Sequence, residues 1–422
     1  MNYPLLFKAV VRLPILLLTL LAVSEACIAA EPALSLAEAL RIATRDSSLL
    51  AAQRAAIDAA QESTVSAREL PDPRLKFGVD NFPLDGADKY SLTRDFMTLR
   101  RIGVAQEFPR TEKRDIKGRR AQHQLAREQA MLGDTRATLR RDVATAWMDR
   151  YFAEQMAKAV DEQYAESVLQ RDALQAGVAA NRTTVLERYT LDATLQMLLD
   201  RRAEFDRQAA RARAMLSRWL GEAGSHPLAS LADAPAQSYA IETPVAHHAH
   251  LQSLERQIDI AQSEADLAKA ATKPDWGLEL SYQQRGPQYS NMLSLQVSID
   301  LPLFTDRRQN RDAAAKLALV EQARALHEDA LRLHLAEATA ARSDWEAASA
   351  RLKRFDDTLL PLARARMTLA LAAYRSGIGT LASALETRRT ELDLRLQKLQ
   401  LAAEQGRAYA QLIYFLPEEH AQ

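Results

Sequence analysis

Residues 276–283 read Trp276-Gly-Leu-Glu-Leu-Ser-Tyr-Gln283, in which large apolar side chains alternate with small or polar ones. This period of two is typical of a β-strand with one apolar face. After a turn at Gly286-Pro287, a second alternating run covers residues 292–301. The two runs predict a pair of strands, and the rest of the fold can be predicted outward from this pair.

A second strand pair occurs in the first half of the chain. Leu75, Phe77 and Val79 alternate with polar residues, and a following run ends at Glu-Phe-Pro109, just as the later run ends at Asp-Leu-Pro302. Helical periodicity precedes and follows both pairs. We therefore predict that the two halves are homologous repeats.

A very long helix is predicted after each strand pair. Over residues 113–175 and again over 308–375, apolar residues recur mostly at steps of four or seven, the spacing of helices packed as a coiled coil. Each long helix is expected to break at a glycine, Gly177 or Gly377, because glycine readily adopts the left-handed conformation of such a turn. A second helix then returns, over residues 185–220 and 381–415.

The composition agrees with long helices and excludes several functions. The chain has 422 residues, 55 Lys and Arg against 55 Asp and Glu, 13 glycines and one cysteine. A balanced charge gives no general attraction to nucleic acid, and one cysteine excludes a disulfide framework or a Cys-built zinc site. No catalytic carboxylate pair, Ser/His/Asp pattern or phosphate-binding loop is recognisable. We therefore expect no nucleic-acid partner, no cofactor and no enzymatic activity.

The N-terminus has the charged, apolar and small-residue order of a secretory signal peptide. Lys8 and Arg12 precede an apolar run over residues 13–23, which is too short to cross a bilayer as a helix. We expect a signal peptide over residues 1–30 that is removed on export. The alternative is that Cys27 carries a lipid anchor, although Ser24 and Glu25 stand where a bacterial lipobox has Leu and a small neutral residue.

Four strands with one apolar and one polar face are predicted to lie in an outer membrane. Their length and alternation match the strands of an outer-membrane β-barrel, and the signal peptide directs the chain beyond the inner membrane. The alternative is a small soluble sheet that buries one face in a core. Because hydrocarbon does not tolerate the two open edges of such a sheet, closure requires several copies, and three copies would give twelve strands around a polar lumen.

The predicted fold is mainly α with a small β part. It consists of duplicated long α-helical coiled-coil hairpins and four strands per protomer, which contribute to a trimeric twelve-stranded outer-membrane barrel. The expected divisions are a first repeat over residues 31–226, a connector over 227–244, a second repeat over 245–415 and a C-terminal tail over 416–422. The strands are expected at about residues 74–82, 98–108, 275–284 and 292–301, and the hairpin tips near residues 177 and 377.

A family resemblance rests on the segment Tyr374-Arg-Ser-Gly-Ile-Gly-Thr-Leu-Ala-Ser-Ala-Leu-Glu-Thr387. It resembles the second helical turn of the TolC family of outer-membrane efflux proteins, with Glu-Thr in place of the common Asp-Ala. The duplicated plan extends the resemblance over essentially the whole mature chain. Residues 75–82 and 97–109 are most similar to the outer-membrane components of heavy-metal exporters of the resistance-nodulation-division (RND) type.

The resemblance implies a homotrimer in the outer membrane, surrounded by lipid, with a helical tunnel through the periplasm. Its implied partners are a periplasmic adaptor and an inner-membrane RND pump, and its implied function is that of a passive exit duct for heavy-metal cations. Drug efflux and type I protein secretion are alternative uses of such a duct. A periplasmic coiled-coil adaptor is an alternative of a different class, but an adaptor should carry Gly-rich β domains around a single hairpin.

The resemblance also assigns the adaptor contact to the two hairpin tips. The implied contact positions are Gly177-Val178 and Gly377-Ile378, and the alternative for each is a plain turn between two helices.

Acidic residues just past the tips are implied to line the constricted end of the tunnel. Threefold symmetry would turn Glu187 and Glu386 each into a ring of carboxylates, which favours cations. The alternative is a solvated helix face on which Arg188, Arg388 and Arg389 are ordinary ion-pair partners. Arg388 and Arg389 could instead hold the closed tip through salt bridges between protomers.

Three histidines, His247, His248 and His250, form a cluster before the second repeat. Such side chains can bind a transition metal if the loop bends around the ion. A polar surface loop is the favoured interpretation, so no metal site is predicted.

Overall fold

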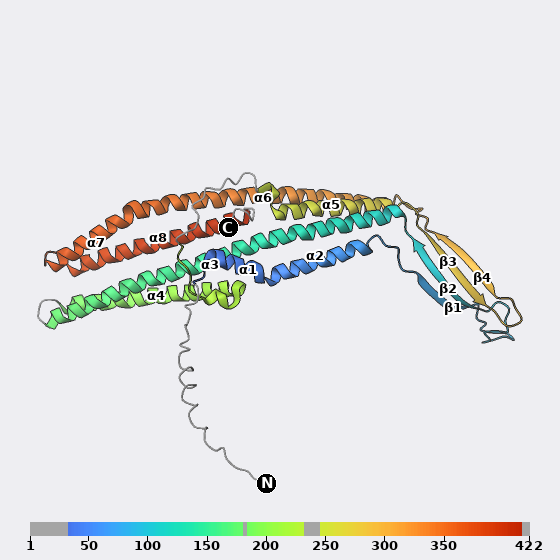
Figure 1. Ribbon diagram of the computed structural model, residues 1–422, viewed down its shortest axis with the longest axis horizontal. Helices are drawn as coiled ribbons and strands as arrows, with labels where there is room; N and C mark the ends of the chain where they lie inside the picture. The colour runs from blue at the N-terminus through green and yellow to red at the C-terminus, as the bar shows by residue number, and fades with distance from the viewer. Residues whose placement is uncertain (1–32, 180–183, 232–244, 416–422) are drawn as a thin grey trace, which may run out of the picture.

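The computed structural model describes residues 33–179, 184–231 and 245–415. The predicted signal peptide with Cys27, most of the connector and the C-terminal tail lie outside the described residues. The molecule is elongated, with two helical hairpins at one end and a four-stranded sheet at the other (Figure 1). Within the described residues, no helix combines the length and the apolar character needed to cross a membrane.

Both halves contain the same order of elements: helix, two strands and a hairpin of long helices. The first half comprises α1 (Leu36–Asp46), α2 (Ser48–Ser66), β1 (Arg74–Asp80), β2 (Leu99–Phe108), α3 (Thr111–Ala179), α4 (Val185–Leu220) and a short turn η1 (Gly221–Ser225). The second comprises η2 (Val245–His247), α5 (Ala249–Ala270), β3 (Trp276–Gln284), β4 (Met292–Ile299), α6 (Gln309–Arg354), η3 (Phe355–Leu359), α7 (Leu360–Arg375) and α8 (Leu381–Phe415). The duplicated, mainly helical fold predicted from the sequence is confirmed.

Helix α3 is the central element of the helical part. Its 69 residues give a length of about 104 Å at a rise of about 1.5 Å per residue. Along one side of it, Leu139, Val143 and Trp147 are almost completely buried and pack in one core with α1, α4 and α8. The core is therefore a strip along α3, which explains why the apolar periodicity extends over so many turns.

The second long helix differs from the prediction. Instead of one α-helix over residues 308–375, the chain forms α6, a single π-helical turn at η3 and then α7. Pro361 stands in the first turn of α7. Because proline has no N–H to donate and its ring crowds the carbonyl one turn earlier, the regular hydrogen-bond ladder is interrupted there. The helix changes direction at this point (Figure 1).

The strands form one antiparallel sheet in the order β1-β2-β3-β4. Its register aligns Phe77 with Ile102, and Ile102 with Tyr282, so the apolar members of all four alternating runs lie on one face. Strands β1 and β4 are the two open edges. The loops after β1 and β3 lie at the end of the sheet far from the helices (Figure 1).

Candidate channel site: the sheet, the hairpin tips and the groove between the hairpins

The apolar face of the sheet is exposed to its surroundings. Phe77 is 82 % exposed, and no helix covers this face. The other large apolar side chains that are exposed on it are Leu75, Val79, Ile102, Val104, Trp276, Leu280, Tyr282, Leu293, Leu295, Val297 and Ile299. An apolar patch of this extent requires a partner or a lipid phase.

The opposite face of the sheet carries charged side chains in pairs. Lys76 Nζ lies 2.6 Å from Glu279, which stands two strands away, and Arg101 lies 3.4 Å from Asp80. Lys76 reaches across β2 at Gly103, where a Cβ would stand 2.7 Å from the Cβ of Ser281. This face is therefore polar and balanced in charge.

Two aromatic rings mark the end of the apolar face next to the helices. Phe108 and Trp276 are paired in the register and stack with centroids 4.3 Å apart. Aromatic rings at the margins of an apolar band are typical of membrane proteins. The stack therefore gives one boundary of the apolar band.

The second hairpin turns at Gly377, as the sequence predicts. The residue has φ +77°, and its N–H donates to the carbonyl of Tyr374. A side chain at this φ is strained, so glycine suits the position. The next residue, Ile378, is 87 % exposed and projects an apolar side chain from the end of the molecule.

The first hairpin does not turn at Gly177. Helix α3 continues through Gly177 and Val178 to Ala179, so the chain reverses between Ala179 and Val185. A lone glycine costs a helix only about 1 kcal/mol, which is too little by itself to end one. Instead, Thr184 begins the returning helix.

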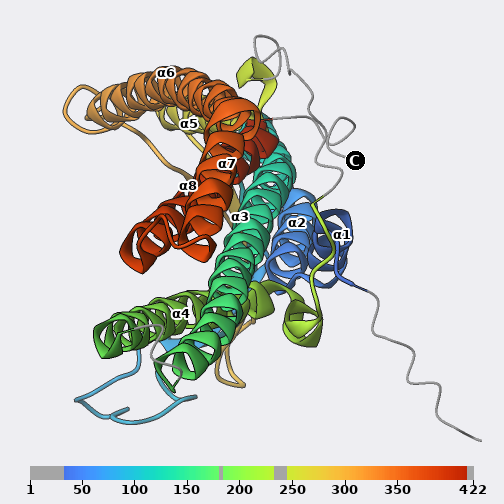
Figure 2. The ribbon, with the colours of Figure 1, turned by 90° about the vertical axis from the view of Figure 1, so that its left-hand side faces the viewer.

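The two tips lie next to each other and share a small core (Figure 2). Leu174, Leu191 and Leu381 are buried together there, with Tyr374 packed against them. Burial, and then the charge of Glu187, raise the pKa of the Tyr374 hydroxyl. The tips of the two repeats therefore form one continuous surface.

Glu187 and Glu386 occupy different environments. The Glu187 carboxylate accepts a hydrogen bond from the backbone of Thr184 at 3.0 Å, while the Thr184 hydroxyl accepts one from the Glu187 N–H at 3.3 Å. This capping box gives Glu187 a local structural role. Glu386 is exposed and forms no ion pair within the described part of the chain.

Glu386 lines a groove of about 740 Å³ between the two hairpins. Helices α3, α4 and α8 contribute its walls, and Arg388 and Arg389 also line it. Arg389 is exposed and only 3.9 Å from Asp393 on its own helix. Arg388 is only 11 % exposed and lies 2.9 Å from Glu166 of α3. Of the two predicted arginines, Arg388 therefore joins the hairpins within one protomer.

Further ion pairs join the hairpins along the same line, and their acidic partners were missed in the sequence. Arg395 and Arg407 of α8 lie 2.7 Å from Glu162 and Asp149 of α3, respectively, and Arg201 of α4 lies 2.6 Å from Asp393. The spacing of the acidic residues along one side of α3 could have indicated in the sequence that this side forms ion pairs. Choosing their partners requires the register between α3 and α8.

The histidine cluster is built differently from the predicted surface loop. His247 is exposed, whereas His248 is buried against Tyr414 and His334. His248 Nε2 donates to the carbonyl of Tyr414 at 2.9 Å, and its Nδ1 accepts the N–H of His250 at 3.2 Å. Both ring nitrogens of His248 are therefore engaged. Among the described residues, no group of three or more His, Cys, Asp or Glu side chains could hold a metal ion.

His334 of α6 was not recognised from the sequence as part of this cluster. It is 6 % exposed, it stacks on His250, and neither of its ring nitrogens has a hydrogen-bond partner. Burial lowers the pKa of both His334 and His248. Asp134 of α3 closes the cluster by accepting the Tyr414 hydroxyl at 2.9 Å. The cluster thus joins α3, α6, α8 and the start of the second repeat.

Residues 241–416 match the model of the family described as outer membrane efflux protein. No curated protein matches the chain.

Several solved structures share the fold. A membrane protein of Pseudomonas aeruginosa superposes with a TM-score of 0.78 at 16% identity, covering 90% of this chain and 89% of its own. CusC, whose structures are described in terms of folding and transmembrane channel formation, gives 0.76 at 14% identity, covering 89% and 90%. The outer membrane protein VceC of Vibrio cholerae gives 0.75 at 18% identity, covering 90% and 95%. The resemblance therefore extends over both repeats.

Proposed function

We propose that the chain is the exit duct of a tripartite RND-type efflux system and that its cargo is heavy-metal cations. The proposal is supported by the match of its second repeat, over residues 241–416, to the model of the outer membrane efflux protein family. The chain is a passive channel subunit and not an enzyme. Energy for transport would come from the inner-membrane pump.

The two-faced sheet is the observation that carries the membrane part of this proposal. The exposed apolar face, bounded by the Phe108–Trp276 stack, is suited to lipid, and the face with the paired charges is suited to water. Dyad alternation of this kind is the signature of outer-membrane barrels. The helices then extend away from the sheet toward the periplasm.

The open edges support a homotrimer. Strands β1 and β4 each have one unpaired edge, and hydrocarbon does not tolerate unpaired backbone groups. Pairing β4 of one protomer with β1 of the next closes the sheet, and three copies of four strands give the twelve of the proposed barrel.

The joined tips support docking of a periplasmic adaptor. Ile378 presents exposed apolar surface at the end of α7, and Leu186 and Tyr189 present more at the start of α4. Apolar side chains at the end of an otherwise polar coiled coil provide a contact for a partner. The proposed contact on the second tip is Gly377-Ile378. On the first tip, the predicted contact was Gly177-Val178, but both residues still belong to α3. The proposed contact on this tip therefore extends to the start of α4.

The proposed cargo rests on two features. By sequence, residues 75–82 and 97–109 resemble segments of heavy-metal exporter components. Glu386 is an exposed carboxylate that three copies would arrange as a ring. Such a ring favours cations. Glu187, whose carboxylate serves its helix cap, contributes less to this argument.

Two experiments test the proposal. The protein should fractionate with the outer membrane and migrate as a trimer before denaturation, whereas a soluble periplasmic monomer would overturn the duct. Deletion of the gene should lower tolerance to one or more of copper, silver, zinc, cobalt and cadmium. If metal tolerance is unaltered and drug tolerance or secretion of a protein is lost, the duct remains and the cargo assignment is wrong.

A further inference from the structure

Arg100 lies on the apolar face of the sheet. In β2 the even-numbered residues share one face, so Arg100 lies on the same side as Ile102 and Val104. In the register it stands between Val79 and Gln284, one row beyond the row of Phe77, Ile102 and Tyr282. Arg100 is thus the cationic residue that ends the apolar face on β2.

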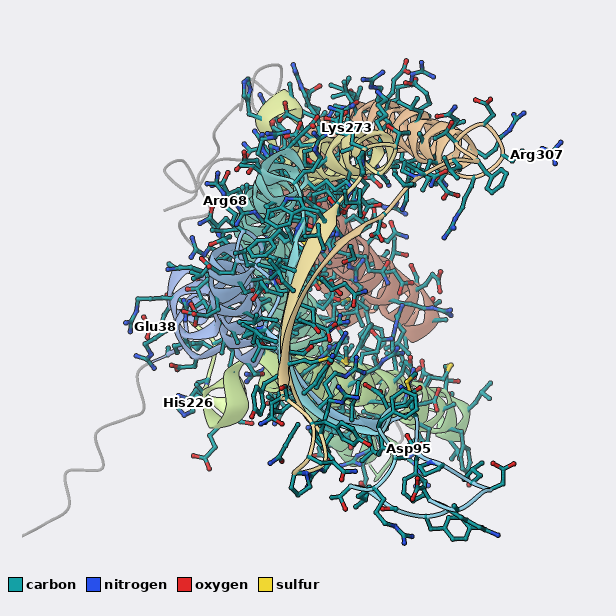
Figure 3. The ribbon with its side chains drawn as sticks, turned by 90° about the vertical axis from the view of Figure 1, so that its right-hand side faces the viewer. Glu38, Arg68, Asp95, His226, Lys273 and Arg307 are labelled. Carbon is teal, nitrogen blue, oxygen red and sulfur yellow. The ribbon has the colours of Figure 1, made fainter. Side chains whose placement is uncertain are left out.

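The guanidinium of Arg100 has no acidic partner in the described chain. Its one recorded hydrogen bond is from Nη2 to the carbonyl of Arg285 at 3.2 Å, and its Nε has no acceptor. Asp95, labelled in Figure 3 in the loop before β2, instead accepts the backbone N–H groups of Met97 and Thr98. The positive charge of Arg100 is therefore not neutralised by the protein.

Comparison with the neighbouring Arg101 shows that the lack of an acidic partner depends on the face of the sheet. Arg101 points to the polar face of the same strand and forms an ion pair with Asp80 at 3.4 Å. The two arginines are successive residues of β2, so they lie at nearly the same distance along the strand. They differ in the face that they occupy and in whether the protein supplies a counter-charge.

The position of Arg100 along the strand matches a membrane boundary. Phe108, at the opposite end of the apolar face, is eight positions further along β2, which is about 27 Å at about 3.4 Å per residue. With the usual strand tilt of about 40°, the height is roughly 20 Å, close to the apolar band of about 25 Å in outer-membrane barrels. Since the Phe108–Trp276 stack marks the helical, periplasmic side, Arg100 lies at the level of the outer-leaflet headgroups.

We propose that Arg100 binds a phosphate group of lipopolysaccharide in the outer leaflet. An arginine presents paired donors that fit phosphate oxygens, and it remains charged at the membrane surface. The exposed side chains of Ile102 and Phe77 continue inward from it and would contact the acyl chains of the same molecule. A ligand with both an anionic head and apolar chains fits this surface, whereas a free phosphate ion would use only the guanidinium. The inference rests on the proposed outer-membrane location.

The test is binding of purified lipopolysaccharide to the detergent-solubilised full-length trimer, measured by native mass spectrometry or by thermal protection. Arg100→Gln should weaken binding by about tenfold or more, as expected for the loss of a charge-assisted hydrogen bond. Arg101→Gln is the matched control and should bind as the wild type does. Inorganic phosphate should give no protection, and lipopolysaccharide with its lipid phosphates removed should bind the wild type as weakly as the intact lipid binds Arg100→Gln.

Three results would overturn the inference: unchanged binding by Arg100→Gln, an equal loss in both variants, or equal binding of the dephosphorylated lipid. Failure of the proposed function is distinguishable, because it would appear as a wild-type protein that is neither trimeric nor in the outer membrane. A trimeric outer-membrane protein that binds lipopolysaccharide independently of Arg100 would refute this inference alone.

Discussion

The guanidinium of Arg388 in α8 lies 2.9 Å from the carboxylate of Glu166 in α3, and the pair joins the two hairpins close to their tips. Arg388 is 11 % exposed, Glu166 is 57 % exposed, and two nitrogens of Arg388 have no other acceptor. Removing Glu166 would leave the Arg388 guanidinium without a carboxylate, whereas removing Arg388 would leave Glu166 to the solvent. Any movement of one hairpin tip relative to the other must therefore lengthen or break this contact.

We predict that Arg388→Ala loosens the contact between the two tips. The loss should destabilise the inter-hairpin contact by about 1–3 kcal/mol, between the values typical of exposed and buried pairs. Single-channel conductance in planar bilayers should rise, and cells should become more sensitive to large antibiotics.

The matched control for this variant is Arg389→Ala, because Arg389 is exposed and only weakly paired within α8. The exchange Arg388→Glu with Glu166→Arg should restore part of the wild-type conductance. Equal conductance of wild type, Arg388→Ala and Arg389→Ala would rule out a gating role for both arginines.

A second prediction concerns the exposed tip. Ile378→Ala should leave the melting temperature unchanged, because the side chain is 87 % exposed, but it should weaken cross-linking to the adaptor. Leu369→Ala, also an exposed apolar position but within α7, should change neither the melting temperature nor the cross-linking. Gly377→Ala should instead cost about 1–2 kcal/mol of stability, because its backbone has φ +77°. If Ile378→Ala and Leu369→Ala reduce cross-linking equally, the tip is not the specific contact.

A third prediction compares two glycines of the sheet. A Cβ at Gly103 would lie 2.7 Å from the Cβ of Ser281, whereas a Cβ at Gly78 meets nothing within 4 Å. Gly103→Ala should therefore lower the yield of assembled trimer and its melting temperature, and Gly78→Ala should be tolerated. The measurement is the heat-resistant trimer band on semi-native gels. Equal yields from the two variants would contradict the close approach of β2 and β3 at this point.

The histidine cluster predicts how stability depends on pH. Burial lowers the pKa of His334 and His248 below the ordinary value of 6.5, so at mildly acidic pH the unfolded chain binds more protons than the folded one. The free energy of unfolding should therefore be unaffected by these groups above about pH 6.5 and should fall as the pH drops below it. Glu337 and Asp134 oppose the shift of His334 but do not form hydrogen bonds to its ring.

The measurement is thermal denaturation of the purified protein between about pH 7.5 and pH 5. His334→Phe should reduce the loss of stability on acidification, because a neutral ring of similar shape replaces the titrating one. His327→Phe, on the same helix but outside the cluster, is the control. If both variants keep the wild-type pH dependence, burial of His334 does not govern acid stability.

Much of the fold follows from local periodicity in the sequence. The alternation around Trp276 and Phe77 identified the strands and their apolar face, and the returning helices were predicted over the same residues that the structure assigns to α4 and α8. The turn at Gly377 was also predicted, because its φ is a property of the residue itself. These features are determined by residues that are close together in the sequence, so the sequence alone is enough to predict them.

The remaining features depended on tertiary structure. Gly177 did not end α3, because packing of a long helix against its neighbours outweighs the small local penalty of one glycine. Arg388 could be named from the sequence, but Glu166 could not be chosen as its partner, and His334 could not be placed beside His248. Such pairings require the relative register of helices far apart in sequence, which side-chain packing along the whole length of α3 decides.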